Sequence, residues 1–214
     1  MSAIPAATER IRPETVVVLG VAATVAQALF LREMLPLFTG SEFVVAVLLG
    51  GWLAWTGTGA LAGGRLLGRR AGSTTFFQIA ALLAGLLIPA TVLGIRIVRS
   101  AIVVVPGAMP PFQPAIAACL LFPAPFCLLY GFIYNAASRL LAGGGGTAAG
   151  VSRAYILEAA GALAGAPLFA FLVAPRMTHV AGAAATATLV MAAVLPGVST
   201  GGRRIGGVVA TLMA

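Results

Sequence analysis

The chain has 214 residues, of which 60% are hydrophobic and only 8% are charged, and its formal net charge is +8. A soluble domain carries roughly 25% charged residues, so this composition excludes an ordinary water-soluble globular protein. It favours a membrane protein with several spans, because each transmembrane helix needs about 20 mostly apolar residues.

The basic residues are all arginine, and they stand singly or in pairs at the ends of apolar segments. A nucleic-acid-binding surface instead groups its basic side chains on one face. The layout therefore argues against a nucleic-acid partner and marks where the chain leaves the bilayer. The bias toward alanine, glycine and arginine, with no lysine, suggests a bacterial genome rich in G and C.

Taken in chain order, the apolar segments predict an all-α fold, a polytopic bundle of six transmembrane helices. Residues 1–14 form an N-terminal segment, residues 15–198 the transmembrane domain, and residues 199–214 a basic turn with an apolar tail. The tail, at 205–214, is too short for a span and is either interfacial or the start of a seventh helix. The six spans are expected at 15–31, 43–67, 75–95, 114–140, 154–174 and 179–198.

The arginine count in the short loops predicts the orientation. The first apolar run has no small-residue cleavage site at its end, so it is expected to be a retained span rather than a signal peptide. With the N-terminus inside, nine arginines lie in cytoplasmic segments and four (Arg32, Arg96, Arg99 and Arg176) in outside segments. Because cytoplasmic loops are enriched in basic residues, we expect a multi-pass protein of the bacterial inner membrane with a cytoplasmic N-terminus.

Glu158 is the most informative polar residue, because it lies inside the expected fifth span. A carboxylate at membrane depth is costly and usually has a partner or a function. One interpretation is a proton or substrate site. The other, favoured because Glu158 lies about one turn from the expected cytoplasmic end, is an ion pair with Arg139 or Arg153.

Other polar residues in or beside the spans are expected to be structural. Arg32 and Glu33 end the first span and Glu42 opens the second, so these residues are expected to cap helices and to anchor the outer interface. Gln27 lies within the first span, and Tyr130 and Asn135 lie within the fourth. Hydrogen bonds between membrane helices contribute roughly 0.6 kcal/mol on average. Gln27 and Glu33 are also kept as transport candidates.

Small residues recur at four-residue spacing, which lets helix backbones approach closely. They predict a tightly packed bundle or an interface with a partner. The helix-packing candidates are Gly59 with Gly63, Gly64 with Gly68, and Gly161 with Gly165.

The sequence predicts no catalytic residue, no metal site and no cofactor. Cys119 and Cys127 are eight residues apart, lack a zinc-site pattern, and are expected to be small core residues. His179 is the only histidine, so the chain cannot supply two histidines to a haem. Residues 197–201 spell G-x-S-x-G, but a hydrolase needs that motif between a strand and a helix, and here it ends a span.

Two stretches carry a family resemblance: ALFLREMLPLFTGSE at residues 28–42, with the glycine-rich second span that follows, and SRAYILEAAGA at residues 152–162. Together they resemble the membrane region of bacterial integral-membrane spermidine-synthase-like proteins. That resemblance implies a multi-span region joined to a cytosolic aminopropyltransferase-like domain. The catalytic domain is missing here and the chain has no aspartate, so the resemblance does not extend to aminopropyl transfer.

The connection GGRLLGRR at residues 63–70 is similar to the corresponding loop of major-facilitator transporters, without the aspartate usual in that loop. This similarity implies a six-helix half of a transporter-like fold.

Three functional hypotheses follow. The first is a non-enzymatic membrane subunit that anchors or scaffolds partner proteins, as a hetero- or homo-oligomer surrounded by lipid. The second is a small transporter or half-transporter for a polyamine-like or other small solute, which Glu158, Gln27 and the transporter-like loop favour. The third, an intramembrane enzyme, is the weakest, because no nucleophile with a matching base and no metal constellation is present.

Overall fold

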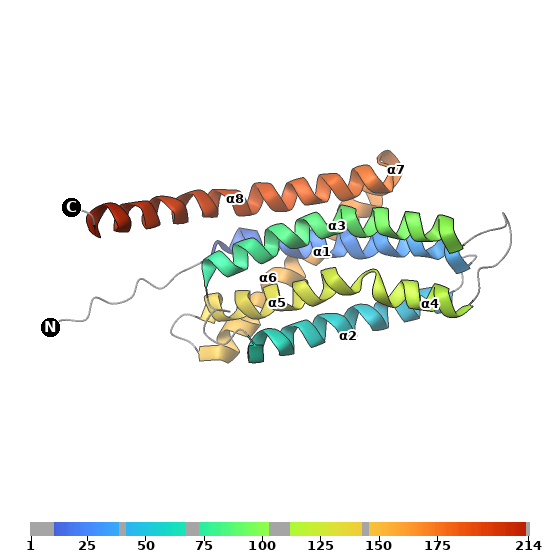
Figure 1. Cartoon of the computed structure of the whole chain (residues 1–214), viewed down its shortest axis with the longest axis horizontal. Helices are drawn as coiled ribbons and strands as arrows, with labels where there is room; N and C mark the ends of the chain where they lie inside the picture. Colours follow the sequence, from blue (N-terminus) through green and yellow to red (C-terminus); the bar gives the residue numbers. More distant parts are fainter. Residues whose placement is uncertain (1–10, 39–41, 67–72, 103–111, 143–145, 213–214) are drawn as a thin grey trace.

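The computed structural model describes residues 11–38, 42–66, 73–102, 112–142 and 146–212. In these residues the regular structure is helical and there is no strand, which confirms the expected all-α fold. The same part of the chain contains six helical segments that are long and apolar enough to cross a membrane, as the composition predicted. Figure 1 shows the long helices lying side by side as one elongated bundle.

The first three spans are α1 (Pro13–Met34, followed by a 3-10 turn at Leu35–Phe38), α2 (Glu42–Leu66) and α3 (Thr74–Ile102). Helix α3 continues beyond residue 95, where the span was expected to end, and includes Arg96 and Arg99. Arginine is a good helix former, and its long side chain reaches toward the interface. These arginines therefore mark the depth of the membrane boundary and not the end of the helix.

The fourth span is broken into α4 (Phe112–Leu121) and α5 (Ala124–Ala142), although one continuous helix was expected. Pro123 lies in the break, and proline lacks an N–H and disrupts the helix at the preceding turn. The indole N–H of Trp55 donates a 2.9 Å hydrogen bond to the carbonyl oxygen of Leu120. This bond satisfies a carbonyl beside the break, which is required inside a bilayer.

The fifth span begins at Gly146, well before the expected residue 154, and is built from α6 (Gly146–Leu168), a π-helical turn at Phe169–Val173 (η4) and the short α7 (Ala174–Arg176). The proline at position 175 cannot donate to the carbonyl of Phe171, four residues earlier. The guanidinium of Arg176 donates to that carbonyl instead.

The last helix, α8 (His179–Leu212), is continuous through the segment 199–204, where a turn was expected. That expectation came from two glycines and two arginines. Neither residue type ends a helix by itself, because glycine costs only about 1 kcal/mol and arginine is a good helix former. Proline 196 lies inside α8 and removes only one backbone donor.

Glycines set the closest helix contacts. A Cβ atom at Gly161 of α6 would overlap backbone atoms of Val17 on α1, and Gly165 also meets α1 backbone. On the other side of the bundle, a Cβ at Gly59 of α2 would overlap the carbonyl of Leu128 on α5, and Gly63 faces a side chain of α5. Gly64 has only ordinary contact with Asn135, and Gly68 lies outside the described residues. The bundle therefore includes two closely packed pairs, α1 with α6 and α2 with α5.

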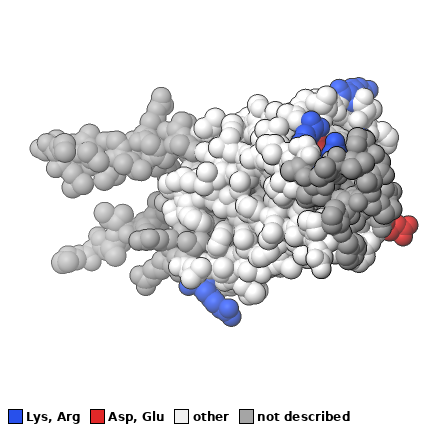
Figure 2. Space-filling view, turned by 45° about the vertical axis from the view of Figure 1, so that its right-hand side comes forward, with Lys and Arg blue, Asp and Glu red and all other residues white. Residues whose placement is uncertain are grey.

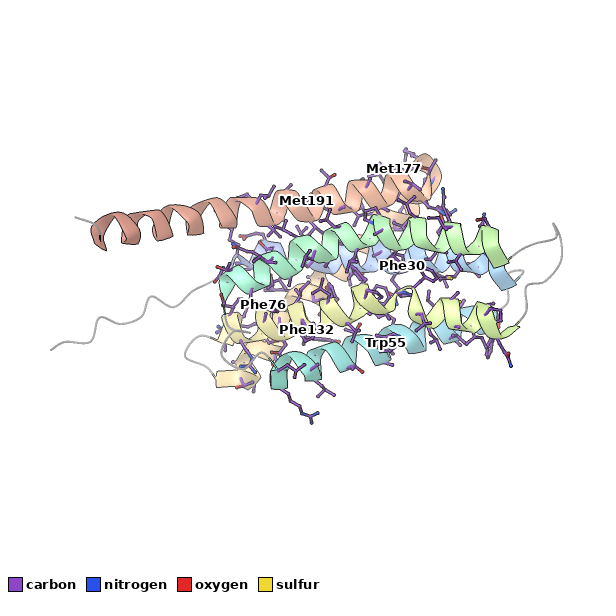
Figure 3. All side chains as sticks on the ribbon, in the orientation of Figure 1. Phe30, Trp55, Phe76, Phe132, Met177 and Met191 are labelled. Atoms are coloured by element: carbon purple, nitrogen blue, oxygen red, sulfur yellow. The ribbon has the colours of Figure 1, made fainter. Side chains whose placement is uncertain are left out.

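Aromatic rings fill the space between these two pairs. Phe30 of α1 makes an edge contact with Phe126 of α5 at 5.7 Å between ring centroids, and Trp52 of α2 lies 5.5 Å from the same ring. Phe126 also stacks on Tyr130 at 5.8 Å. Figure 3 shows side chains between the ribbons and labels Phe30, which is fully buried. Tyr130 is buried as part of this cluster.

We predict that Gly59→Ala destabilises the protein, whereas Gly57→Ala, two residues away on the same helix, does not. A Cβ at position 59 meets the α5 backbone, whereas a Cβ at position 57 meets no atom within 4 Å. Alanine gains about 1 kcal/mol of helix propensity at both sites, but overpacking costs about 1–3 kcal/mol at position 59 only. Unfolding midpoints in detergent measure the difference, and equal midpoints would contradict the packing described.

Candidate functional site

The first polar site, the Glu33 cluster, consists of Glu33, Arg96 and His179. Glu33 lies in the last turn of α1 and is only 2% exposed. Arg96 of α3 approaches its Oε1 atom with Nε at 2.8 Å and with a terminal nitrogen at 2.7 Å. Nδ1 of His179, the first residue of α8, lies 2.6 Å from the same oxygen. One carboxylate thus joins three helices.

The topology explains why these three residues meet. Helices α1 and α3 end, and α8 begins, at the same end of the bundle (Figure 1). We call this the Glu33 end, and the opposite end, where α5 ends and α6 begins, the Arg139 end. The sequence predicted that Glu33 caps a helix and anchors the outer interface. The structure instead turns it inward against Arg96 and His179, which lie 63 and 146 residues away in the sequence.

Arg32 makes a further contact at the Glu33 end. The guanidinium of Arg32 lies 5.8 Å from the centre of the Phe169 ring in η4, within the range of a cation–π contact. On the face that Figure 2 displays, the charged atoms lie toward the ends and the broad middle is uncharged. Such a distribution suits a protein whose middle faces lipid.

The second polar site, the Glu158 cluster, consists of Glu158 and the three tyrosines of the chain, Tyr130, Tyr134 and Tyr155. The side chains of Tyr130 on α5 and Glu158 on α6 interact with each other. Tyr134 lies one turn further along α5, and its phenol interacts electrostatically with Glu158 and Tyr155. Tyr130 is buried, Glu158 and Tyr134 are half-buried, and Tyr155 is 65% exposed. The cluster therefore leads from the core to the surface of α6.

Glu158 lies farther from the start of its helix than the expected span boundary at residue 154 implied. Glu158 lies twelve residues after Gly146, where α6 begins, which corresponds to about 18 Å along the helix axis. It lies five residues, or about 7.5 Å, from Arg153. Three helical turns, and not one, therefore separate it from the start of α6. A Cβ at Gly20 of α1 would overlap the carbonyl of Glu158, so α1 fixes the position of this part of α6.

The structure gives Glu158 a different partner from the arginines considered in the sequence analysis. The partner is the phenol of Tyr130. Nε of Arg139 donates to Oδ1 of Asn135 at 3.0 Å, and a terminal nitrogen of Arg139 lies 3.4 Å from the carbonyl oxygen of Gly64 on α2. Arg153 donates to the carbonyl of Leu141 at 3.2 Å. These arginine bonds hold helix ends together at the Arg139 end.

The remaining candidates lie apart from both clusters. Gln27 is half-buried on α1, seven residues after Gly20 and so on the same helical face. Cys119 and Cys127 are buried and unpaired, one on α4 and one on α5. Among the described residues, no group of three or more histidine, cysteine or acidic side chains is placed to hold a metal ion.

Comparison of the chain with protein-family models, with curated proteins and with solved structures finds no match in any of the three.

We predict that Glu33→Ala destabilises the protein strongly, whereas Glu42→Ala does not. Removing one member of a buried, hydrogen-bonded ion pair leaves its partners unsatisfied, at a cost of about 3 kcal/mol. Glu42 is exposed at the start of α2, where an acidic side chain contributes less than about 1 kcal/mol. Thermal unfolding of both variants in the same detergent measures the difference. A Glu33→Ala midpoint no lower than that of Glu42→Ala would contradict the role assigned to the cluster.

Proposed function

We propose that the chain is a non-enzymatic integral membrane subunit that anchors or scaffolds partner proteins in a membrane complex. The observation that supports this proposal is the incomplete burial of α6 around its carboxylate. Only 17% of the apolar window of the fifth span is buried, compared with 56% for α1. Most of α6 therefore lies on the outer surface of the bundle.

An apolar face toward lipid needs no partner, but this face carries polar groups. Glu158 is half-buried and Tyr155 is largely exposed. A carboxylate at the centre of a membrane helix costs roughly 2.5–3.5 kcal/mol on insertion scales. A neighbouring protein over this side of α6 would remove the contact between the carboxylate and lipid.

Small side chains continue the same side of α6. Ala159, Ala162 and Ala166 follow Tyr155 and Glu158 at spacings of three and four residues, which places all five on one helical face. We call these five residues the α6 face. Ala159 and Ala166 are exposed and Ala162 is half-buried. Because small residues let membrane helices approach closely, the shape of this face suits another helix.

A second candidate function is a small transporter or half-transporter for a polyamine-like or other small solute. The Glu158 cluster favours it, because a carboxylate beside aromatic rings is chemistry that attracts organic cations. Uptake of labelled spermidine into proteoliposomes that depends on Glu158 would favour transport over a scaffold.

We predict that a cysteine on the α6 face crosslinks to a neighbouring protein in native membranes, whereas a cysteine on another side of the same helix does so far less. Ala166→Cys and Ala164→Cys provide the comparison, since both positions are exposed and lie about 200° apart around the helix. A short thiol-to-amine crosslinker should produce a larger species only with Ala166→Cys. The same result for both positions, or for neither, would contradict a partner at the α6 face.

The proposed orientation is tested separately. Ser100 is exposed at the Glu33 end and Thr147 at the Arg139 end. Nine arginines against four predict that the Arg139 end is cytoplasmic, so a membrane-impermeant thiol reagent added to intact cells should label Ser100→Cys and spare Thr147→Cys. The opposite labelling pattern would reverse the orientation.

A further inference from the structure

In the described part of the chain, two carboxylates are buried or half-buried, and they differ in their partners. Glu33 is held by a guanidinium and an imidazole on the same oxygen. Glu158 has the hydroxyl group of Tyr130 as its partner. In the described part of the chain, no cationic side chain lies within salt-bridge distance of Glu158. Its charge is therefore not compensated by these residues.

Ionisable residues inside membranes pair with one another or with backbone groups. Besides the carboxylate, the Glu158 cluster contains aromatic rings that can attract a cation. Tyr134 interacts electrostatically with Glu158 and with Tyr155. Tyr134 is half-buried and Tyr155 is exposed, and ammonium and guanidinium groups are attracted to such rings. The α6 face continues from this point as a stripe of alanines that suits a helix.

We propose that the α6 face receives a transmembrane helix of a partner protein that carries a lysine or arginine at the depth of Glu158. This inference rests on the proposed function and specifies the chemistry of the partner. The basic side chain bonds the carboxylate and lies against Tyr134 and Tyr155, while the partner backbone packs on Ala162 and Ala166.

A second copy of this chain fits the α6 face less well. Two copies in one membrane share their orientation, so a two-fold contact between α6 helices places equivalent residues at equal depth. It would bring two Glu158 side chains together, and like charges destabilise each other. The residues of the α6 face supply hydroxyl and methyl groups and no cation. A different protein can supply the missing charge.

The test uses the purified full chain, reconstituted in liposomes with synthetic polyleucine transmembrane peptides. One peptide has a single lysine at the depth of Glu158, a second has leucine at that position, and a third has glutamate. Association is followed by energy transfer from a donor dye on Thr147→Cys, away from the α6 face. We expect the lysine peptide to bind about tenfold more tightly than the leucine peptide, and the glutamate peptide to bind no more tightly than the leucine peptide.

Variants of the chain assign the effect to Glu158. Glu158→Gln should abolish the preference for lysine, Glu158→Asp should retain most of it, and Glu42→Gln at the Glu33 end should leave it unchanged. The unfolding midpoint of Glu158→Gln is measured too, to separate loss of binding from loss of stability. Ala162→Leu blocks the alanine stripe but keeps the carboxylate, so it should also weaken binding.

Equal binding of the lysine and leucine peptides would overturn the inference, as would a lysine preference that survives in Glu158→Gln. Spermidine binding that requires Glu158, without any peptide preference, would assign the cluster to a solute instead. A homodimer of Ala166→Cys linked by a disulfide between the two introduced cysteines would replace the partner with a second copy. If Ala166→Cys crosslinks a different protein but the peptides show no charge preference, the proposed subunit role stands and this inference fails. If neither experiment shows a partner, both fail.

Discussion

The constraint on which the rest of the structure depends is that a polar group inside a bilayer must find its partner within protein. The break in the fourth span leaves the carbonyl of Leu120 near Pro123, and the Trp55 indole donates to it. The proline at position 175 leaves the carbonyl of Phe171 without its helical donor, and Arg176 supplies one. At these two interruptions a side chain from the same bundle donates to a backbone carbonyl.

The two membrane carboxylates show how far this constraint is met within one chain. Glu33, which is only 2% exposed, has Arg96 and His179 against its Oε1 atom, and these contacts join α1, α3 and α8. Glu158 satisfies the constraint in part, through Tyr130, and remains half-buried on the least covered span. The first cluster explains why the bundle holds together at one end. The second cluster is the basis of the proposed contact with another protein.

Composition and apolar segment length were enough to predict the all-α fold and the six spans, because hydropathy measures the property that the membrane selects. They were not enough to predict the break at Pro123, since proline occurs within membrane helices when neighbours satisfy the freed groups. The start of α6 was also misplaced, because glycine, serine and arginine at 146–153 lower the local hydropathy without ending the helix.

The candidate sites were only partly predictable. Glu33, Arg96 and His179 could each be assigned to the same side of the membrane by counting spans, but their contact depends on long-range packing that no local pattern records. Tyr130 and Glu158 were each recognised as polar residues in spans. Their pairing depends on how α5 and α6 pack, and the close contact of Gly150 on α6 with the carbonyl of Ser138 on α5 is part of that packing. The spacing of glycines in the sequence indicates that helices pack closely. It does not indicate which helix each glycine contacts.

The central claim is that the chain is a subunit, with its α6 face covered by another protein. The most direct test is the mass of the intact particle extracted from native membranes in polymer nanodiscs and measured by native mass spectrometry. The account predicts a particle heavier than the 21.5 kDa chain by at least one further, different polypeptide, which remains bound until the helices unfold. A particle that contains a single chain and lipid alone would contradict it.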